Sequence, residues 1–284
     1  MIEIKKIGSA DVIATIDADT LVGADLREMR LEDADLENAD LSHAILDFAD
    51  LNRANLKGAN LQHASLIGAH MNDADLSNAD LSYAELGSDI HADAAMLLNS
   101  KLIHANLSHA YLHWVDFREA DLSQANLSRA DMRHAVFFRA NLTEVTANDC
   151  LFIRANLREV NLNHADLRDS HFNDANMIKA NLSYANLQSN HEDGFAVINK
   201  ANLERADLRH AQMSNIFARS VNFHQADLSD ANLEEAVITG SIISHANVSG
   251  AEFKGVELGT ITMGYSNFSQ ALNANIPGHK KNVQ

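Results

Sequence analysis

The chain has 284 residues, of which 46% are hydrophobic but only 6% are aromatic, and its formal net charge is −17. A single cysteine excludes a disulfide-stapled fold and favours a reducing compartment. The acidity argues against direct nucleic-acid binding and against an anionic membrane surface, because both require a basic patch. No apolar run approaches 18 residues, and Met1–Ile16 lacks the basic-then-apolar layout of a signal peptide. We therefore expect no membrane contact and a cytoplasmic location.

Residues 1–19 differ in pattern from the rest of the chain. Apolar residues at Ile2 and Ile4, and again from Val12 to Ile16, flank the turn-forming pair Gly8-Ser9. Two short β-branched runs around such a pair predict a β-hairpin. We expect this hairpin to cap the structure that follows, covering its apolar end and its open strand edges.

From Ala24 to Leu86 the chain repeats every five residues as Ala-(Asp/Asn)-Leu-x-x. The Leu position, called the centre below, is Leu in 12 of 13 cases, and Ala stands two residues before it in 12 of 13. A period of five fits neither an α-helix nor a single strand, and it excludes a heptad coiled coil. A narrow core column filled by one large and one small residue in every five explains the low aromatic content, because a larger side chain would overfill it.

Runs such as Ala34-Asp35-Leu36-Glu37-Asn38 and Ala54-Asn55-Leu56-Lys57-Gly58 resemble the motif of the pentapeptide-repeat family. The resemblance extends over roughly residues 20–270. It implies an all-β fold, a right-handed quadrilateral β-helix with four pentapeptides per coil, in which centres and the preceding Ala face inward. We expect a hairpin cap at 1–19, the repeat solenoid at 20–272 and a polar C-terminal tail at 273–284. Representative core centres are Leu26, Leu56, Leu86, Leu122, Leu157 and Leu208.

The five-residue register shifts by one residue within 87–96 and again within 188–197. These segments are 101 residues apart, which we interpret as five coils plus one inserted residue. Both are therefore expected to project from the same side of the solenoid. They are either bulges that relieve twist or a paired contact surface. The candidate contact residues are Asp89, His91, Asp93, His191, Glu192 and Asp193.

Acidic residues concentrate at the beginning of the chain, where residues 1–96 contain 19 acids and 6 bases. The candidate acidic interaction surface consists of Asp25, Glu28, Glu32, Asp33, Asp35, Glu37, Asp40, Asp75 and Asp80. We expect Asp35 to share a face with Asp75, and Asp40 with Asp80. Such a charge run is either a solvated face that maintains solubility or a substitute for duplex DNA.

The family resemblance bears on the second interpretation. Some pentapeptide-repeat proteins mimic DNA and occupy the DNA-binding saddle of bacterial type II topoisomerases. This chain departs from that subgroup in having Leu at most centres, where the subgroup has Phe, and in lacking a helix-like dimerising segment at its C-terminal end.

Histidines are the other residues with potential chemistry. If each irregular segment adds one residue, one column of second residues after the centre contains His43, His63, Tyr83, His104, Gln124, Glu144, His164, Tyr184, Arg205, Gln225, His245 and Tyr265. No third metal ligand of defined geometry accompanies the stacked histidines, so we favour a polar–aromatic ladder. Exposed histidines would gain charge between about pH 5 and 7. Cys150 occupies an inward position and is expected to be a buried small side chain.

No nucleophile–base pair and no phosphate-binding glycine loop is evident, so we expect no catalysis, no cofactor and no metal. The sequence predicts a non-catalytic scaffold that binds another protein, either as a monomer or as an end-to-end dimer. The alternative is an acidic DNA mimic that binds and inhibits or protects bacterial DNA gyrase. A third hypothesis is a pH- or metal-responsive module built on the histidines.

Overall fold

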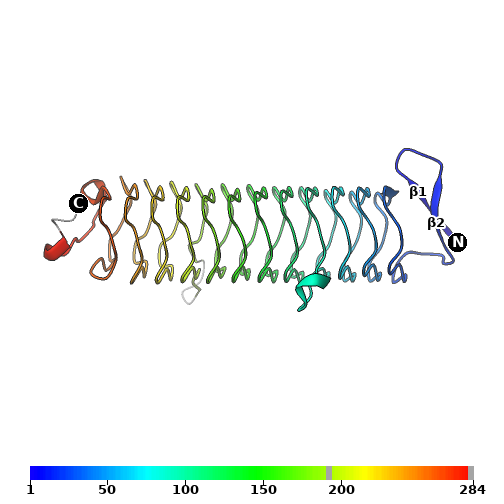
Figure 1. Cartoon of the computed structure of the whole chain (residues 1–284), viewed down its shortest axis with the longest axis horizontal. Coiled ribbons are helices and arrows are strands. Elements are labelled where there is room, and N and C mark those ends of the chain that lie inside the picture. Colours follow the sequence, from blue (N-terminus) through cyan, green and yellow to red (C-terminus); the bar gives the residue numbers. More distant parts are fainter. Residues whose placement is uncertain (190–193, 281–284) are drawn as a thin grey trace. The chain divides into compact units, whose positions relative to one another are not determined.

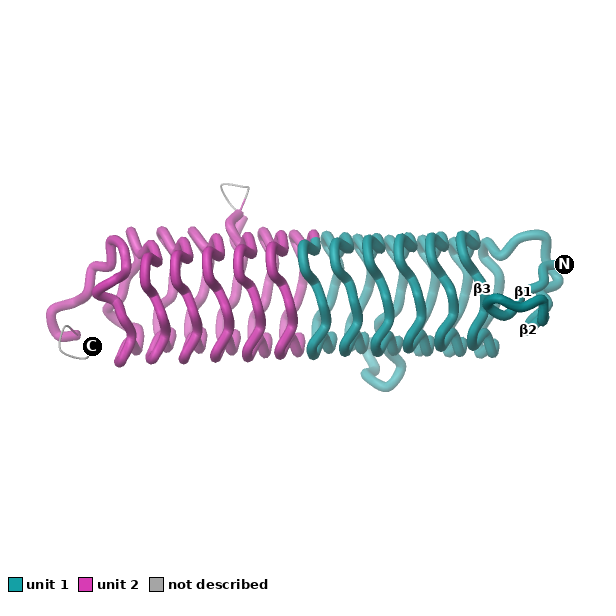
Figure 2. The backbone as a smooth tube through the Cα atoms, turned by 90° about the horizontal axis from the view of Figure 1, so that it is seen from above, with its two compact units in different colours: residues 1–145 teal, residues 146–284 magenta. Residues whose placement is uncertain are grey.

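The computed structural model describes residues 1–189 and 194–280 (Figure 1). Its regular elements are the strands β1 (Ile2–Lys6), β2 (Val12–Ile16) and β3 (Ala34–Asp35) and the 3₁₀ turns η1 (His91–Asp93), η2 (Phe268–Gln270) and η3 (Gly278–Lys280). The chain divides into two compact units, Met1–Val145 and Thr146–Gln284, coloured separately in Figure 2. None of the helices in the described ranges is long and apolar enough to cross a membrane.

Within each unit the backbone winds in coils whose neighbours are joined by parallel β-bridges (Figure 1). The residue before each centre bridges the residue 20 positions later, as in the ladder from Asp35 to Asn55 and on to Asp75. A repeat of 20 means that one coil holds four pentapeptides. The right-handed quadrilateral β-helix expected from the sequence is thereby confirmed.

The bridge ladders of unit 1 define four faces, numbered here in chain order. Face 1 carries Asp25, Ile45, Ser65, Glu85, Tyr111 and Asp131; face 2 carries Arg30, Asp50, His70, Met96, Asp116 and Val136; face 3 carries Asp35, Asn55, Asp75, Lys101, Asp121 and Asn141; face 4 carries Asp40, Asn60, Asp80, Asn106 and Asn126.

Each corner between faces is a tight turn that begins at a centre. The N–H of Ala34, for example, donates to the carbonyl of Leu31 at 3.0 Å and closes the turn. The second residue after the centre has a positive φ, 58° at Asp33 and 59° at Arg53. That is the conformation that a type II turn requires at its third residue, and it costs an L-residue roughly 1–2 kcal/mol. Burial of the centre offsets this cost at every corner.

The core consists of the centres and the small residues two positions before them. The centres Leu26, Leu56, Leu86, Leu122, Leu157 and Leu208 are all 0–1% exposed. Where two neighbouring coils both have a phenylalanine centre in the same column, the rings stack, as Phe152 does on Phe172 with centroids 4.6 Å apart. Cys150 is also completely buried in unit 2.

Serine replaces the inward alanine at several positions and is buried there with its hydroxyl paired. Ser170 Oγ donates to the carbonyl of Ala147 at 2.6 Å and accepts from the N–H of Cys150 at 2.9 Å. Ser241 makes the equivalent pair of bonds in a later coil. A buried hydroxyl is tolerated here because two backbone groups of the preceding coil satisfy it.

The N-terminal residues form the expected hairpin. β1 pairs antiparallel with β2, and its other edge pairs antiparallel with β3, so the strand order is β2-β1-β3. Ile4 of β1 is buried. Because β3 is the first strand of face 3, the hairpin continues the sheet of that face beyond the first coil (Figure 1).

The described part of the C-terminal segment folds back onto unit 2. Lys280, at the end of η3, donates from Nζ to the carbonyls of Leu258 at 3.1 Å and Ile261 at 2.5 Å. These bonds satisfy carbonyls that no later coil pairs. The described part of the predicted polar tail, up to Lys280, therefore contacts unit 2 through its last turn.

The irregular segment of unit 1 contains six extra residues, and the prediction of a single inserted residue is wrong. The N–H of Ala95 donates to the carbonyl of Leu86 at 2.9 Å, the same bond that closes a regular corner, but across nine residues in place of three. His70 accordingly bridges Met96, 26 positions later. Six residues equal one pentapeptide plus one residue, so counting centres in steps of five detects only the one residue left over.

The six-residue insertion moves every later pentapeptide of unit 1 to the next face. Tyr83 therefore stacks on His109 at 4.6 Å, and the predicted neighbour His104 belongs to another column. In unit 2 His171 bridges Val197, again 26 positions later, and Tyr184 stacks on His210 where Arg205 was expected. The expectation that both segments lie on the same side depended on a single inserted residue and loses its basis.

Candidate functional site

The most distinctive surface feature of unit 1 is the loop Gly87–Ala95, which leaves the corner after face 1 and contains η1 (Figure 2). The N–H of Gly87 donates to the carbonyl of Tyr111 at 2.8 Å. A Cβ at position 87 would lie 2.3 Å from the backbone nitrogen of His113, so only glycine fits. The base of the loop is thus held against the backbone of the next coil.

Asp89 anchors the middle of the loop. Its Oδ1 accepts from the Tyr111 hydroxyl at 2.8 Å and lies 3.2 Å from Nδ1 of His113. The hydrogen bond from Tyr111, and then that from His113, holds the pKa of Asp89 below its usual value. Burial, and then the bond to Asp89, raises the pKa of Tyr111 to about 12. Asp89 is thus fixed in position although its side chain is 89% exposed.

An aromatic cluster supports η1. The ring of His91 meets Trp114 edge-on with centroids 4.8 Å apart, and Trp114 stacks on His134 at 4.2 Å. Between these anchors Ile90 is 62% exposed. The loop therefore presents an aliphatic side chain on a fixed support, with Asp89 beside it.

The predicted loop residues of unit 2, His191, Glu192 and Asp193, lie outside the described residues. Beside them, Phe195 packs edge-on against Phe217 with centroids 4.9 Å apart. The ring-bearing residues of the two units are also related in sequence, because His63, Tyr83 and His109 recur 101 positions later as His164, Tyr184 and His210. Each unit thus repeats one arrangement of stacked rings at a corner of the coil that contains six extra residues.

The stacked rings form corner ladders. In unit 1 His43, His63, Tyr83 and His109 follow one another at 5.0, 5.0 and 4.6 Å with nearly parallel planes. In unit 2 Tyr184 lies between His164 and His210, and Tyr265 stacks on His245. The predicted single column is therefore wrong beyond Tyr83, because the insertion changes the face. Over the described ranges, no group of three His, Cys, Asp or Glu side chains is arranged to hold a metal ion.

The nine predicted acidic residues are distributed around unit 1. Asp25 lies on face 1, Asp35 and Asp75 share face 3, and Asp40 and Asp80 share face 4. Glu28, Glu32, Asp33 and Glu37 occupy the corner positions after their centres. The carboxylates thus surround the first coils on every side.

Three of the nine carboxylates are neutralised by ion pairs. Asp25 pairs with Arg27 at 2.6 Å, and the hydrogen bond from that guanidinium lowers the pKa of Asp25 to about 2. Arg53 reaches Glu32 at 2.9 Å and Asp33 at 2.8 Å. Arg53 is the main reason that the pKa of Asp33 is lowered.

The predicted acids that lie on faces 3 and 4 alternate with amides along the ladders. Asn60 donates to Asp40 at 2.9 Å, and Asn106 donates to Asp80 at 3.0 Å. Burial raises the pKa of Asp80, but hydrogen bonds from Gln62, Ser82 and Asn106 outweigh it and leave the pKa below its usual value. Alternation places the carboxylates of one ladder two coils apart, about 9.6 Å at the usual strand spacing, which limits the repulsion between them.

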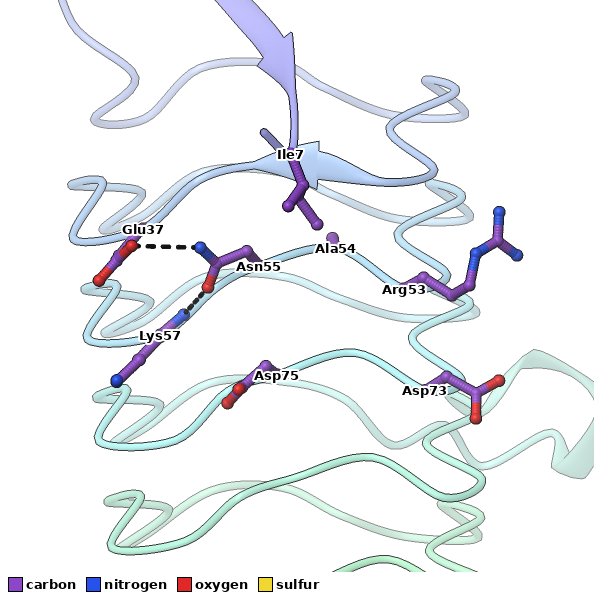
Figure 3. A pocket seen from close by; sticks show the side chains of 8 residues that line it. All are labelled: Ile7, Glu37, Arg53, Ala54, Asn55, Lys57, Asp73 and Asp75. Carbon is purple, nitrogen blue, oxygen red and sulfur yellow. Dashed lines mark hydrogen bonds between the residues drawn. The ribbon is translucent and has the colours of Figure 1, made fainter. Parts of the chain in front are cut away.

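Face 3 is not uniformly acidic. An open hollow of about 370 Å³ lies below Ile7, and its lining combines acids with cations (Figure 3). The acids are Glu37, Asp73 and Asp75, and the cations are Arg53 and Lys57. Figure 3 also shows Asn55 donating to Glu37 at 3.3 Å. This hollow is a shallow polar depression of mixed charge.

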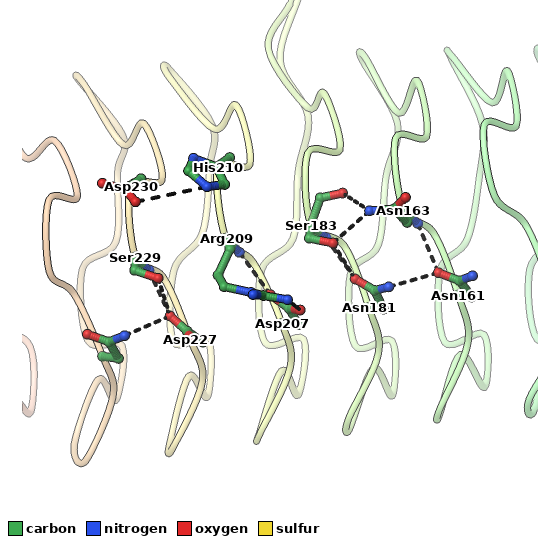
Figure 4. Close-up of polar contacts among 11 residues, drawn as sticks. Asn161, Asn163, Asn181, Ser183, Asp207, Arg209, His210, Asp227, Ser229 and Asp230 are labelled. Atoms are coloured by element: carbon green, nitrogen blue, oxygen red, sulfur yellow. Dashed lines mark hydrogen bonds and ion pairs between the residues drawn. The ribbon is translucent and has the colours of Figure 1, made fainter.

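A ladder of unit 2, which runs through Asn181, Asp207 and Asp227, also combines amides with carboxylates (Figure 4). Asn181 donates to Asn161 at 3.0 Å. Asp207 pairs with Arg209 at 2.6 Å, and this hydrogen bond is the main reason that its pKa is lowered. In this ladder, as in those of unit 1, asparagine side chains donate to the ladder residue of the neighbouring coil.

The charge density of the first coils is close to that of duplex DNA. Residues 21–86 contain 13 acids and 4 bases, a net charge of −9 over 66 residues. At 20 residues per coil and about 4.8 Å per coil, this gives one net charge for every 1.8 Å or so along the axis. Duplex DNA carries one charge for about every 1.7 Å.

These features define a right-handed quadrilateral β-helix whose coils are built from five-residue repeats. The model of the family "Pentapeptide repeats" matches with eight copies, over residues 21–58, 54–87, 95–134, 116–152, 135–174, 155–189 and 219–255. The chain belongs to the pentapeptide-repeat family. No curated protein matches its sequence significantly.

Solved structures of the same family are similar to the chain. HetL, involved in heterocyst differentiation regulation in the cyanobacterium Nostoc sp. strain PCC 7120, is 30% identical with a TM-score of 0.49, over 82% of this chain and 90% of HetL. QnrB1, a plasmid-mediated fluoroquinolone resistance protein, is 15% identical with a TM-score of 0.39, over 75% of this chain and 90% of QnrB1. A pentapeptide-repeat protein of the Arabidopsis thaliana thylakoid lumen is 30% identical with a TM-score of 0.25, over 37% of this chain and 65% of its own.

Proposed function

We propose that this chain is a non-catalytic cytoplasmic solenoid that binds another protein through the loop Gly87–Ala95 of unit 1. The observation that carries the proposal is the exposure of Ile90 on a loop fixed at its base, at Asp89 and at His91. A loop that is already ordered loses little conformational entropy when it binds, so its exposed apolar side chain can contribute most of its burial energy.

The surface beside the loop supports the same proposal. Phe48 occupies the corner between faces 1 and 2, where the loop also leaves, and is 51% exposed. Its ring covers Gly68, where a Cβ would lie only 2.4 Å from it. Tyr83 is exposed on the opposite corner of face 1. Apolar side chains thus border both edges of this face, as expected of a contact surface.

Site-specific photo-crosslinking tests this proposal. A benzophenone side chain at position 90 should give a discrete adduct in host lysate, whereas the same group at the exposed corner Lys179 serves as the matched control. In a second variant, called loop-excised below, residues 87–94 are replaced by Ser-Asn, the pair that follows Leu76 in a regular corner. This variant should keep its fold and lose the partner. Equal adducts at positions 90 and 179, or partner binding retained by the folded loop-excised variant, would refute the proposal.

A second candidate function is a DNA mimic that binds bacterial DNA gyrase or a related type II topoisomerase. The supporting observation is the charge density of residues 21–86, together with the placement of carboxylates on all four faces. A cleft that binds the phosphates of duplex DNA would find a similar negative charge per unit length along the axis of these coils.

A gyrase supercoiling assay tests the mimic. We expect inhibition or protection that weakens as salt increases. Replacing Asp35, Asp40, Asp75 and Asp80 by Asn should reduce the effect while retaining the ladder hydrogen bonds, since each Asn keeps the acceptor oxygen. No effect at tens of micromolar protein, or an effect that the four-fold Asn variant retains in full, would eliminate this candidate.

A further inference from the structure

The strand β2 forms the outer end of the face 3 sheet. The strand order is β2-β1-β3, and from Asp35 of β3 the ladder continues through Asn55 and Asp75 to Lys101. Each of these inner strands is paired on both sides. Among the described residues β2 has β1 as its only neighbour, so one of its edges has unpaired N–H and carbonyl groups.

β2 has one feature that protects edge strands, an irregularity in its pairing with β1 that leaves Ile13 without a partner, but its sequence lacks the others. Val-Ile-Ala-Thr-Ile contains no charge and no proline, and four of its five residues are β-branched. Val12 is 44% exposed, and Thr15 is also exposed. Natural edge strands generally carry Lys or Pro, or are covered, because an open apolar edge readily pairs with another strand. The edge of β2 is therefore available for pairing.

The charges beside β2 indicate what kind of strand would bind. Asp11 precedes the strand and Asp17 and Asp19 follow it, and within the described ranges no Lys, Arg or His lies within ion-pair distance of any of them. In symmetric antiparallel pairing of two copies about Ala14, Asp11 of one copy would face Asp17 of the other. Like charges directly opposite one another destabilise such pairs, whereas opposite charges stabilise them.

We propose that the open edge of β2 accepts an extended segment of a partner protein, with Lys or Arg at each end of a short β-branched run. The bound segment would add one strand to the face 3 sheet. Backbone hydrogen bonds to β2 would provide affinity, and the basic ends would select the partner through Asp11 and Asp17. This site is independent of the loop Gly87–Ala95.

The test uses the full chain and a synthetic probe, the peptide Lys-Val-Thr-Val-Thr-Val-Lys. Hydrogen exchange should show protection by the peptide confined to residues 12–16. The matched peptide with Glu at both ends should bind more weakly. Changing both Asp11→Asn and Asp17→Asn should weaken binding of the Lys peptide about three- to tenfold at low salt, as expected for two exposed charge pairs.

A backbone variant provides the second readout. Proline is tolerated at the first residue of an edge strand but removes its N–H donor, so Val12→Pro should reduce binding in a protein whose thermal unfolding is unchanged. If Val12→Pro unfolds the hairpin, the proposal is still tested by the comparison of the Lys and Glu peptides and by the variant with Asn at positions 11 and 17. No protection of residues 12–16 at millimolar Lys peptide, or equal binding of the Glu peptide, would overturn the proposal. Dimers formed through β2 in sedimentation experiments without peptide would overturn the choice of partner.

Discussion

Excision of the loop in unit 1 tests whether its six extra residues form an insertion on a complete coil. In the loop-excised variant, Ser-Asn joins Leu86 to Ala95 and restores a coil of 20 residues. The bond from the Ala95 N–H to the Leu86 carbonyl is already that of a regular corner, so this variant keeps its closing hydrogen bond. Asn is suited to the positive φ of the second position, as at Asn78 with 59°.

The expected change in stability follows from opposing contributions. Shortening the closed segment from nine residues to three reduces the entropy cost of closure by about 1 kcal/mol. The lost hydrogen bond between Asp89 and Tyr111 contributes about 0.5–1.5 kcal/mol in the opposite direction. The lost edge contact of His91 with Trp114 contributes about 0.5–1.5 kcal/mol more. The free energy of unfolding should therefore change by no more than about 2 kcal/mol.

Urea unfolding followed by circular dichroism measures this change. The control keeps the loop length but replaces residues 88–93 by Gly and Ser, which removes the contacts without shortening the closed segment. This control should be less stable than the loop-excised variant by about 1 kcal/mol, the closure contribution alone. A loss of more than about 3 kcal/mol in the loop-excised variant would refute the assignment of the loop as an insertion.

Three further perturbations test the core and the polar ladders. Leu56→Asp and Ala64→Leu should each destabilise by several kcal/mol, through a buried charge and through overpacking, and a change within about 0.5 kcal/mol in urea unfolding would contradict their inward positions. Ser170→Ala should cost about 1–3 kcal/mol by leaving buried backbone groups unpaired, whereas Ser42→Ala on the surface should cost much less. The folded-state pKa of Asp80 is lowered, so its contribution to stability is present above the unfolded-state pKa and is lost as pH falls through the folded-state pKa. Unfolding measured from about pH 5 to 2 should therefore depend less on pH in Asp80→Asn, and an identical slope would argue against the ladder bonds.

Much of the fold could be predicted from the residues because each pentapeptide shows which of its side chains must face inward. A large centre such as Leu56 and a small residue such as Ala54 can share a narrow column only if both face inward. The Asp or Asn between them has a local reason as well, since its side-chain oxygen accepts the N–H two residues later, as Asp40 does from Ser42 at 3.1 Å. The same Asp or Asn position forms the ladders between coils, so the choice of Asp or Asn in successive coils sets the alternation of carboxylates and amides.

The candidate site was less predictable. The sequence located the segment 87–96 and named Asp89 and His91, but their partners Tyr111 and Trp114 lie one coil later and carry no signal of their own in the repeat. Gly87 was not recognised either, because its role depends on the backbone of the next coil. A motif search along the chain cannot detect these contacts, because they form only between residues of neighbouring coils.

The sequence by itself determined the period of five, the inward positions and the acidity of the first coils. The tertiary structure decided which face each pentapeptide occupies. All four faces of a coil accept the same motif, so a count of centres fixes position only to within a multiple of five and cannot distinguish one inserted residue from six. The hydrogen bond between the Ala95 N–H and the Leu86 carbonyl resolves that ambiguity, because it shows where the chain rejoins the coil. With six residues inserted, Tyr83 stacks on His109, and the exposed Ile90 lies in the inserted loop.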